Sequence, residues 1–108
     1  MPSTLAGSAG NSGSSDGIGA AAQFFNPTDV VADGAGGLYI ADGNSTLRRV
    51  ALADRSVITI AGRAFQARVT LGPLPAGLNR PTAVALLPTG EIIIADATEN
   101  AVLIVGLD

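Results

Sequence analysis

The chain contains no cysteine, histidine or tryptophan, and all six of its basic residues are arginine. Without cysteine it forms neither disulfides nor thiolate metal sites, and without histidine it lacks the commonest general base and metal ligand. Charged residues make up only 14% of the 108 residues, and the net charge is −3. No apolar run approaches the roughly 20 residues that span a bilayer. We therefore predict no membrane segment. We also predict no nucleic-acid partner, because nucleic-acid binding requires basic groups that neutralise phosphate.

The chain does contain an internal repeat. The stretch from Asn26 to Asp42 recurs as the stretch from Arg80 to Asp96, at a constant offset of 54 residues. The matched positions include Pro27 with Pro81, Thr28 with Thr82, Val30 with Val84, Gly36 with Gly90 and Asp42 with Asp96. A repeat of this length is typical of stacked units that are each too small to bury their own apolar surface.

Short apolar runs punctuated by glycine and proline predict β-strands in both copies. The expected strands are residues 28–32, 38–41, 47–50 and 57–61 in the first copy, and 82–86, 92–95 and 102–105 in the second. The second strand of each copy is apolar on both sides, which indicates a sheet covered on both faces. Each unit is therefore predicted to be a four-stranded up-and-down sheet, the blade of a β-propeller.

The two ends of the chain complement one another. We divide it into an outer strand (1–7), a long loop (8–25), a first blade (26–62), a second long loop (63–79) and the first three strands of a second blade (80–108). Phe24, Phe25, Leu74 and Leu78 are expected to anchor the loop ends in the core. The chain starts with a fourth strand and stops before the second blade has one. We expect Ser3, Thr4, Leu5 and Ala6 of one chain to complete the sheet that ends in Val102, Leu103, Ile104 and Val105 of a neighbour.

The pattern from Asn26 to Asp33, followed by Gly37 to Asp42, resembles the NHL repeat. That resemblance implies a β-propeller, usually six-bladed. Two blades cannot close a ring, because propellers have about four to eight. We therefore expect an all-β chain of two four-stranded antiparallel blades that forms a six-bladed homotrimer by strand exchange. Rings of two or four chains are alternatives, as is a monomer whose own N-terminus fills the strand gap.

Several charged residues are candidates for function. One set would bind a protein or small-molecule ligand on the loop-bearing face of the propeller, and the alternative is that its members are simply solvated. The set consists of Asp16, Asp29, Arg63, Arg68 and Arg80. Asp29 could also form a cation-binding ring at the channel mouth. Asp42 and Asp96 would serve a metal or acid–base chemistry, or hold backbone N–H groups in a turn. Arg48 and Arg49 are expected to be solvated on an outer strand.

The function expected from these features is a non-enzymatic, self-assembling propeller that acts as a binding or scaffold platform. One alternative is an excised or engineered pair of blades with no ligand of its own. Another, implied by the resemblance, is part of a calcium-dependent lactonase-like or hydrolase-like propeller. The inner-strand metal cluster of those enzymes is not visible here, and no serine–base pair or phosphate loop is present. We predict no catalytic residue, metal site or cofactor.

Overall fold

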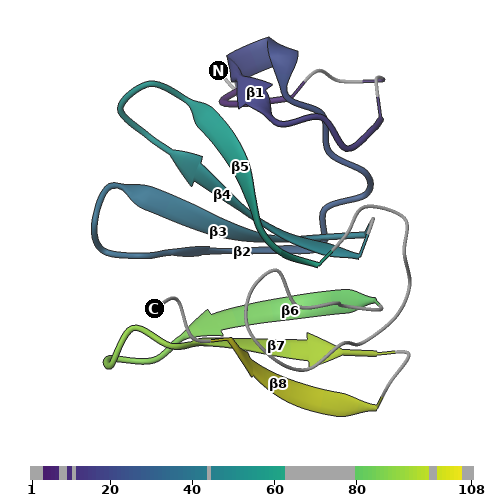
Figure 1. Ribbon diagram of the computed structural model, residues 1–108, viewed down its shortest axis with the longest axis vertical. Helices are drawn as coiled ribbons and strands as arrows, with labels where there is room; N and C mark the ends of the chain where they lie inside the picture. Colours follow the sequence, from purple (N-terminus) through teal and green to yellow (C-terminus); the bar gives the residue numbers. More distant parts are fainter. Residues whose placement is uncertain are drawn as a thin grey trace.

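The computed structural model describes residues 4–7, 10, 12–43, 45–62, 80–97 and 100–105 of the chain. These residues form two antiparallel sheets that pack face to face (Figure 1). The first sheet has the strand order β1-β5-β4-β3-β2, and the second sheet has the order β6-β7-β8. The described residues include one helical element, the 3-10 turn η1 (Gly19–Ala21). In this part of the chain no helix is long and apolar enough to cross a membrane.

The predicted strands are confirmed in both copies. The first sheet runs up and down through β2 (Asp29–Ala32), β3 (Gly37–Asp42), β4 (Thr46–Ala51) and β5 (Ser56–Gly62). The second sheet repeats the first three of these strands as β6 (Pro81–Leu86), β7 (Ile92–Asp96) and β8 (Ala101–Val105). Within each of these two sets, every strand pairs with its neighbour in sequence, as an up-and-down sheet requires.

The turns repeat along with the strands. Gly36 and Gly90, 54 residues apart, have φ values of 85° and 96° before the second strand of each sheet. Ser45 and Asn100 have φ values of 73° and 52° before the third strand. Positive φ is the region that glycine enters without cost and that asparagine tolerates better than most residues. The first two hairpins of each copy of the repeat therefore depend on left-handed residues at matching places.

The main core lies between the two sheets. Because side chains alternate along a strand, one face of the first sheet meets one face of the second. The buried side chains there are Tyr39, Ala41, Leu47 and Ala61 from the first sheet and Val84, Ile92 and Ile94 from the second. Burying an aliphatic side chain of this size contributes about 1.5–3 kcal/mol. This interface is therefore the main source of hydrophobic stabilisation in the described residues.

A second, smaller core covers the opposite side of the first sheet, which we call its outer face. Ala22, Val50 and Val57 are buried there, and Phe24, Leu38 and Ile40 pack against them. The covering residues belong to residues 12–25, which we call the N-terminal segment. The expectation of a plain loop over residues 8–25 is therefore wrong in part. The segment contains η1 and the short strand β1 (Gly17–Ile18), which pairs with the free edge of β5.

Residues 4–7 do not form a strand in the single chain. Ser3 lies outside the described residues, and Leu5 to Gly7 adopt bends. Leu5 is 36% exposed, while Ala6 packs against the smaller core. This places the start beside the first sheet, and β8 lies at the opposite end of the molecule (Figure 1). In the single chain, residues 4–7 do not fill the gap beside β8.

Candidate functional site

The residues predicted to form a binding face have separate partners. Asp16 contacts Arg48 and Thr59 on the first sheet. Asp29 contacts Val84 of the second sheet, and the side chain of Arg80 is exposed just before β6. Arg63 and Arg68 lie outside the described residues, as do Leu74 and Leu78. The structure therefore places Asp16 and Asp29 at two different contacts within the protein.

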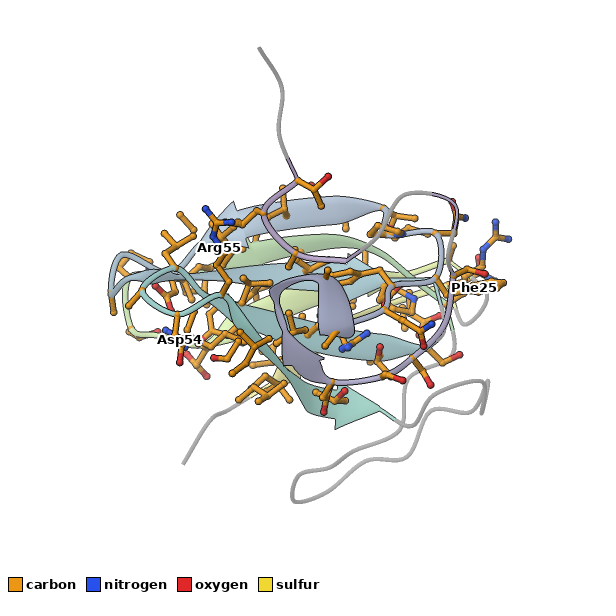
Figure 2. All side chains as sticks on the ribbon, turned by 90° about the horizontal axis from the view of Figure 1, so that it is seen from above. Phe25, Asp54 and Arg55 are labelled. Atoms are coloured by element: carbon orange, nitrogen blue, oxygen red, sulfur yellow. The ribbon has the colours of Figure 1, made fainter. Side chains whose placement is uncertain are left out.

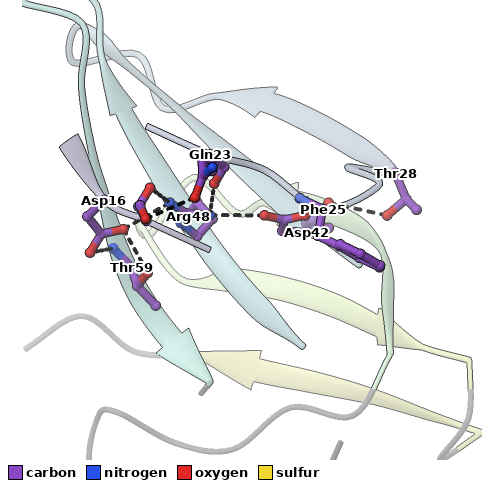
Figure 3. A network of polar contacts seen from close by, with 9 residues as sticks. Asp16, Gln23, Phe25, Thr28, Asp42, Arg48 and Thr59 are labelled. Carbon is purple, nitrogen blue, oxygen red and sulfur yellow. Dashed lines mark hydrogen bonds and ion pairs between the residues drawn. The ribbon is translucent and has the colours of Figure 1, made fainter. Parts of the chain in front are cut away.

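Arg48 holds the N-terminal segment onto the first sheet (Figure 3). One terminal nitrogen, Nη1, donates to the carbonyl of Gln23 at 2.9 Å and to Asp42 at 3.0 Å. The other, Nη2, donates to the carbonyl of Ser15 at 3.0 Å and to Asp16 at 2.9 Å. The guanidinium carbon lies 5.0 Å from the ring centroid of Phe24, within the range of a cation–π contact. One side chain thus fixes both ends of the segment.

The expectation that Arg48 is solvated is wrong. Its side chain is fully buried, and so is that of Asp42, whereas Asp16 remains 46% exposed. Arg48 and Val50 are two residues apart on β4, so both side chains lie on the outer face, where the N-terminal segment covers them. The sequence signal for this burial is the alternation of side chains along a strand, which places Arg48 on the same face as Val50. The position of Asp16, 32 residues earlier in the chain, could not be predicted from any local pattern.

Asp42 holds a backbone N–H group, as one of the two sequence interpretations proposed. The carboxylate accepts from the N–H of Phe25 at 2.9 Å as well as from Arg48. Burial raises the pKa of the Asp42 carboxyl, although the Phe25 N–H and Arg48 act in the opposite direction. Asp96 makes the matching contact in the second sheet, where it accepts from the N–H of Arg80 at 3.1 Å. Both carboxylates therefore fix the chain where it enters a sheet.

Arg49 makes a second ion pair at the opposite end of the first sheet. It donates to Asp33 through Nε at 3.0 Å and Nη2 at 2.8 Å, and its side chain is 26% exposed. Asp33 also accepts from the N–H groups of Ala35 and Gly37 in the hairpin turn. The Ala35 N–H and the Arg49 guanidinium lower the pKa of Asp33. The prediction of a solvated Arg49 is therefore correct only in part.

Asp29 links the two sheets at the strands β2 and β6. One carboxylate oxygen accepts from the N–H of Val84 at 2.9 Å, and the other accepts from the N–H of its neighbour Val30, also at 2.9 Å. Next to it, the hydroxyl of Thr28 lies 3.2 Å from the carbonyl of Pro81. Both oxygens of Asp29 thus have hydrogen-bond donors from the protein. In the part of the chain that the structure describes, no three acidic side chains cluster in a way that could hold a metal ion.

The second sheet presents an apolar surface on the side away from the first sheet, which we call its open face. Val102 is 71% exposed and Ile104 is 65% exposed. The strand register aligns Ile104 with Ile93 and Val102 with Ala95 across the sheet. The open face consists of Ala83, Ala85, Ile93, Ala95, Val102 and Ile104. A contiguous apolar surface on a sheet is characteristic of an interaction site.

The outer face of the first sheet has a hollow that the N-terminal segment does not cover. Its volume is about 460 Å³, and it is lined by Pro27, Thr28, Asp29, Val30 and Ile40. Val30 is 55% exposed there, although Ile40 on the next strand packs against the smaller core. The segment therefore covers the outer face over the later strands and leaves it accessible beside β2. Figure 2 shows the molecule from above, with Phe25 at one end of the strands and Asp54 and Arg55 at the other.

The chain matches no protein-family model and no curated protein. It is similar to a solved structural-genomics protein of unknown function from Bacteroides thetaiotaomicron, with 33% identity and a TM-score of 0.83 over 90% of this chain. It is also similar to an auxiliary nutrient binding protein from Bacteroides ovatus, with 24% identity and a TM-score of 0.76 over 94% of this chain. The chain covers 25% and 28% of those two proteins. The resemblance to the NHL repeat stays a prediction.

Proposed function

We propose that the chain is a non-enzymatic module that associates head to tail with copies of itself into a six-bladed β-propeller. The observation that carries this proposal is the open face of the second sheet. Its six residues are the repeat counterparts of Asp29, Val31, Tyr39, Ala41, Leu47 and Arg49. Tyr39, Ala41 and Leu47 of that set are buried against the second sheet. The same face therefore has a partner in one copy of the repeat and is exposed in the other.

The occupant that fits the open face is the outer face of another chain's first sheet. This contact joins two different surfaces, so it is heterologous and closes into a ring only at a fitting rotation. Three chains would supply six blades, which lies within the range of known propellers. Among the described residues β8 lies at the edge of the second sheet, and residues 3–6 of a neighbour would pair with it as a fourth strand. Open edges and apolar faces left in water favour aggregation.

The ring would present its loops as a binding platform. Asp42 and Asp96 hold Phe25 and Arg80, two described residues shortly before β2 and β6. Arg80 is exposed at this position. Its guanidinium would pair with a carboxylate or phosphate group of a ligand. A binding role also agrees with the name of the Bacteroides ovatus protein. The ligand would be a protein segment or a small molecule.

Light scattering on the purified full chain tests this proposal. We expect a mass of three chains for the parent protein. Ile104→Lys should reduce the mass to that of one chain, because it places a charge in the proposed contact. Leu5→Pro should also reduce it, because proline removes an N–H group that the donated strand needs. Leu52→Lys is the control, since Leu52 is 45% exposed in the turn after β4 and lies outside the open face.

The mass of the parent chain is decisive. A parent mass of one chain contradicts self-assembly. An assembly that withstands Ile104→Lys contradicts the open face as its contact, and one that withstands Leu5→Pro contradicts strand exchange. Circular dichroism of each variant shows whether the strands are kept, so that a loss of assembly is distinguished from a loss of folding.

A further inference from the structure

Two hydrogen bonds join the two sheets of one chain, and the repeat gives each of their partners a counterpart residue. The Thr28 hydroxyl lies 3.3 Å from the carbonyl of Ala41 in its own sheet and 3.2 Å from the carbonyl of Pro81 in the next. Beside it, the N–H of Val84 donates to Asp29 at 2.9 Å. These contacts place β2 against β6 in a fixed register.

The offset of 54 residues gives each partner a counterpart. Thr82 corresponds to Thr28 and makes the first of its two contacts, with its hydroxyl 3.3 Å from the carbonyl of Ala95. The counterpart of the second acceptor, Pro81, is Pro27. Pro27 lines the hollow on the outer face of the first sheet, together with Val30, which is the counterpart of Val84. The hollow thus contains the two positions that a second sheet would contact.

One partner differs in its chemistry. The counterpart of Asp29 is Ala83, which has no carboxylate to offer to the N–H of Val30 in another copy. That N–H already has an acceptor, since it donates to Asp29 of its own chain at 2.9 Å. Covering it with an alanine therefore leaves no backbone donor without a partner, which would otherwise cost about 1–3 kcal/mol. The hollow and the open face are compatible without a carboxylate between them.

We infer that the hollow of one copy receives strands β6 and β7 of the next copy, with Ala83 opposite Val30 and the Thr82 hydroxyl on the Pro27 carbonyl. This inference rests on the proposed self-assembly and specifies its contact. Two kinds of junction then alternate around the ring. The junction within a chain contains the Asp29 carboxylate, whereas the face-to-face contact between chains replaces it with apolar contact and the Thr82 hydrogen bond, beside the strand that the neighbour donates.

Disulfide trapping tests the register, because the chain has no cysteine of its own. Two single variants of the full chain, Ala83→Cys and Val30→Cys, are mixed and oxidised under mild conditions. We expect a disulfide-linked pair of chains in the mixture and none in either variant alone. The double variant Ala83→Cys with Val30→Cys should give linked products up to three chains. A disulfide forms only where the two Cα atoms lie within about 7 Å, so the link reports position directly.

The matched control uses the junction that the structure contains. The double variant Asp29→Cys with Val84→Cys is the repeat counterpart of the test pair and should form its disulfide within one chain. Failure of the mixed variants to link, in a protein whose parent mass is that of three chains, overturns this register and leaves self-assembly standing. Linkage of Ala83→Cys with itself shows two open faces packed together and overturns the head-to-tail contact. A parent mass of one chain overturns both proposals.

Discussion

The two sheets share a repeat but use it in opposite ways. The second sheet covers one face of the first sheet, and the N-terminal segment covers the other face over its later strands and leaves it accessible beside β2. The second sheet has one covered face and one open face of apolar residues. At matching positions Arg48 is replaced by Leu103, Asp29 by Ala83 and Arg49 by Ile104. The first sheet therefore uses charged groups to fix its neighbours within the chain, whereas the second exposes hydrocarbon on its open face.

The largest difference between the sheets is the buried ion pair of Arg48 and Asp42. Arg48→Leu, which copies the second sheet, should lower the free energy of unfolding by about 3–5 kcal/mol, because it leaves a buried carboxylate without its cation. The same change detaches the N-terminal segment, so amide hydrogen exchange should increase in residues 12–25. Urea unfolding measures the loss.

A double variant distinguishes the cost of the unpaired buried carboxylate from the cost of lost packing. Adding Asp42→Asn to Arg48→Leu should recover part of the stability, because the amide oxygen can still accept from the Phe25 N–H while the buried charge is gone. If the double variant is no more stable than Arg48→Leu, the stranded charge is not the cause. An unchanged stability in Arg48→Leu would contradict the anchoring role altogether.

The next difference is the carboxylate between the sheets. Asp29→Ala, which copies Ala83, should cost about 1–3 kcal/mol, since the N–H groups of Val84 and Val30 lose their acceptor. Asp29→Asn retains a side-chain oxygen and should cost less. The order of the two variants in thermal unfolding checks the prediction, and equal losses would show that the hydrogen bonds contribute little.

The smallest difference lies in the first hairpin turn, where Asp33 is replaced by Leu87 in the second sheet. Because the folded state lowers the pKa of Asp33 below its usual value of 3.8, the ionised carboxylate stabilises the fold. That stabilisation is present above the usual pKa and is lost as pH falls through the lowered one. Asp33→Asn should therefore cost about 1 kcal/mol near neutral pH and progressively less in acid. Urea unfolding between neutral pH and acid measures the trend, and a constant loss would contradict it.

The sequence predicted the strands well because their signals are local. Short apolar runs, β-branched residues and glycine turns repeat at one spacing, and the ends of β2 to β8 differ from the prediction by no more than one residue. The strand β1 was not predicted, and residues 4–6 do not form the strand expected of them. Asp42 was also correctly linked to backbone N–H groups in one of two interpretations. These are patterns within a few residues, which single-sequence reasoning can detect.

The site was harder to predict because its contacts join distant parts of the chain. Arg48 is a charged residue in a strand, and such residues are almost never fully buried unless paired. Its partner Asp16 lies in a stretch rich in glycine and serine that resembles a flexible linker. Only the folded chain brings the two together, and the same holds for Asp29 and Val84, which are 55 residues apart. Local periodicity contains no information about such pairs.

The way Arg48 grips the N-terminal segment has a consequence for how this region can diversify. Two of its four hydrogen bonds end on peptide carbonyls, those of Ser15 and Gln23, which every amino acid provides. Substitutions at these two positions therefore keep both carbonyl acceptors and remove only the exposed hydrogen bond from the Ser15 hydroxyl to the Gln23 side chain. A loop held in this manner keeps its shape while the chemistry of its surface varies.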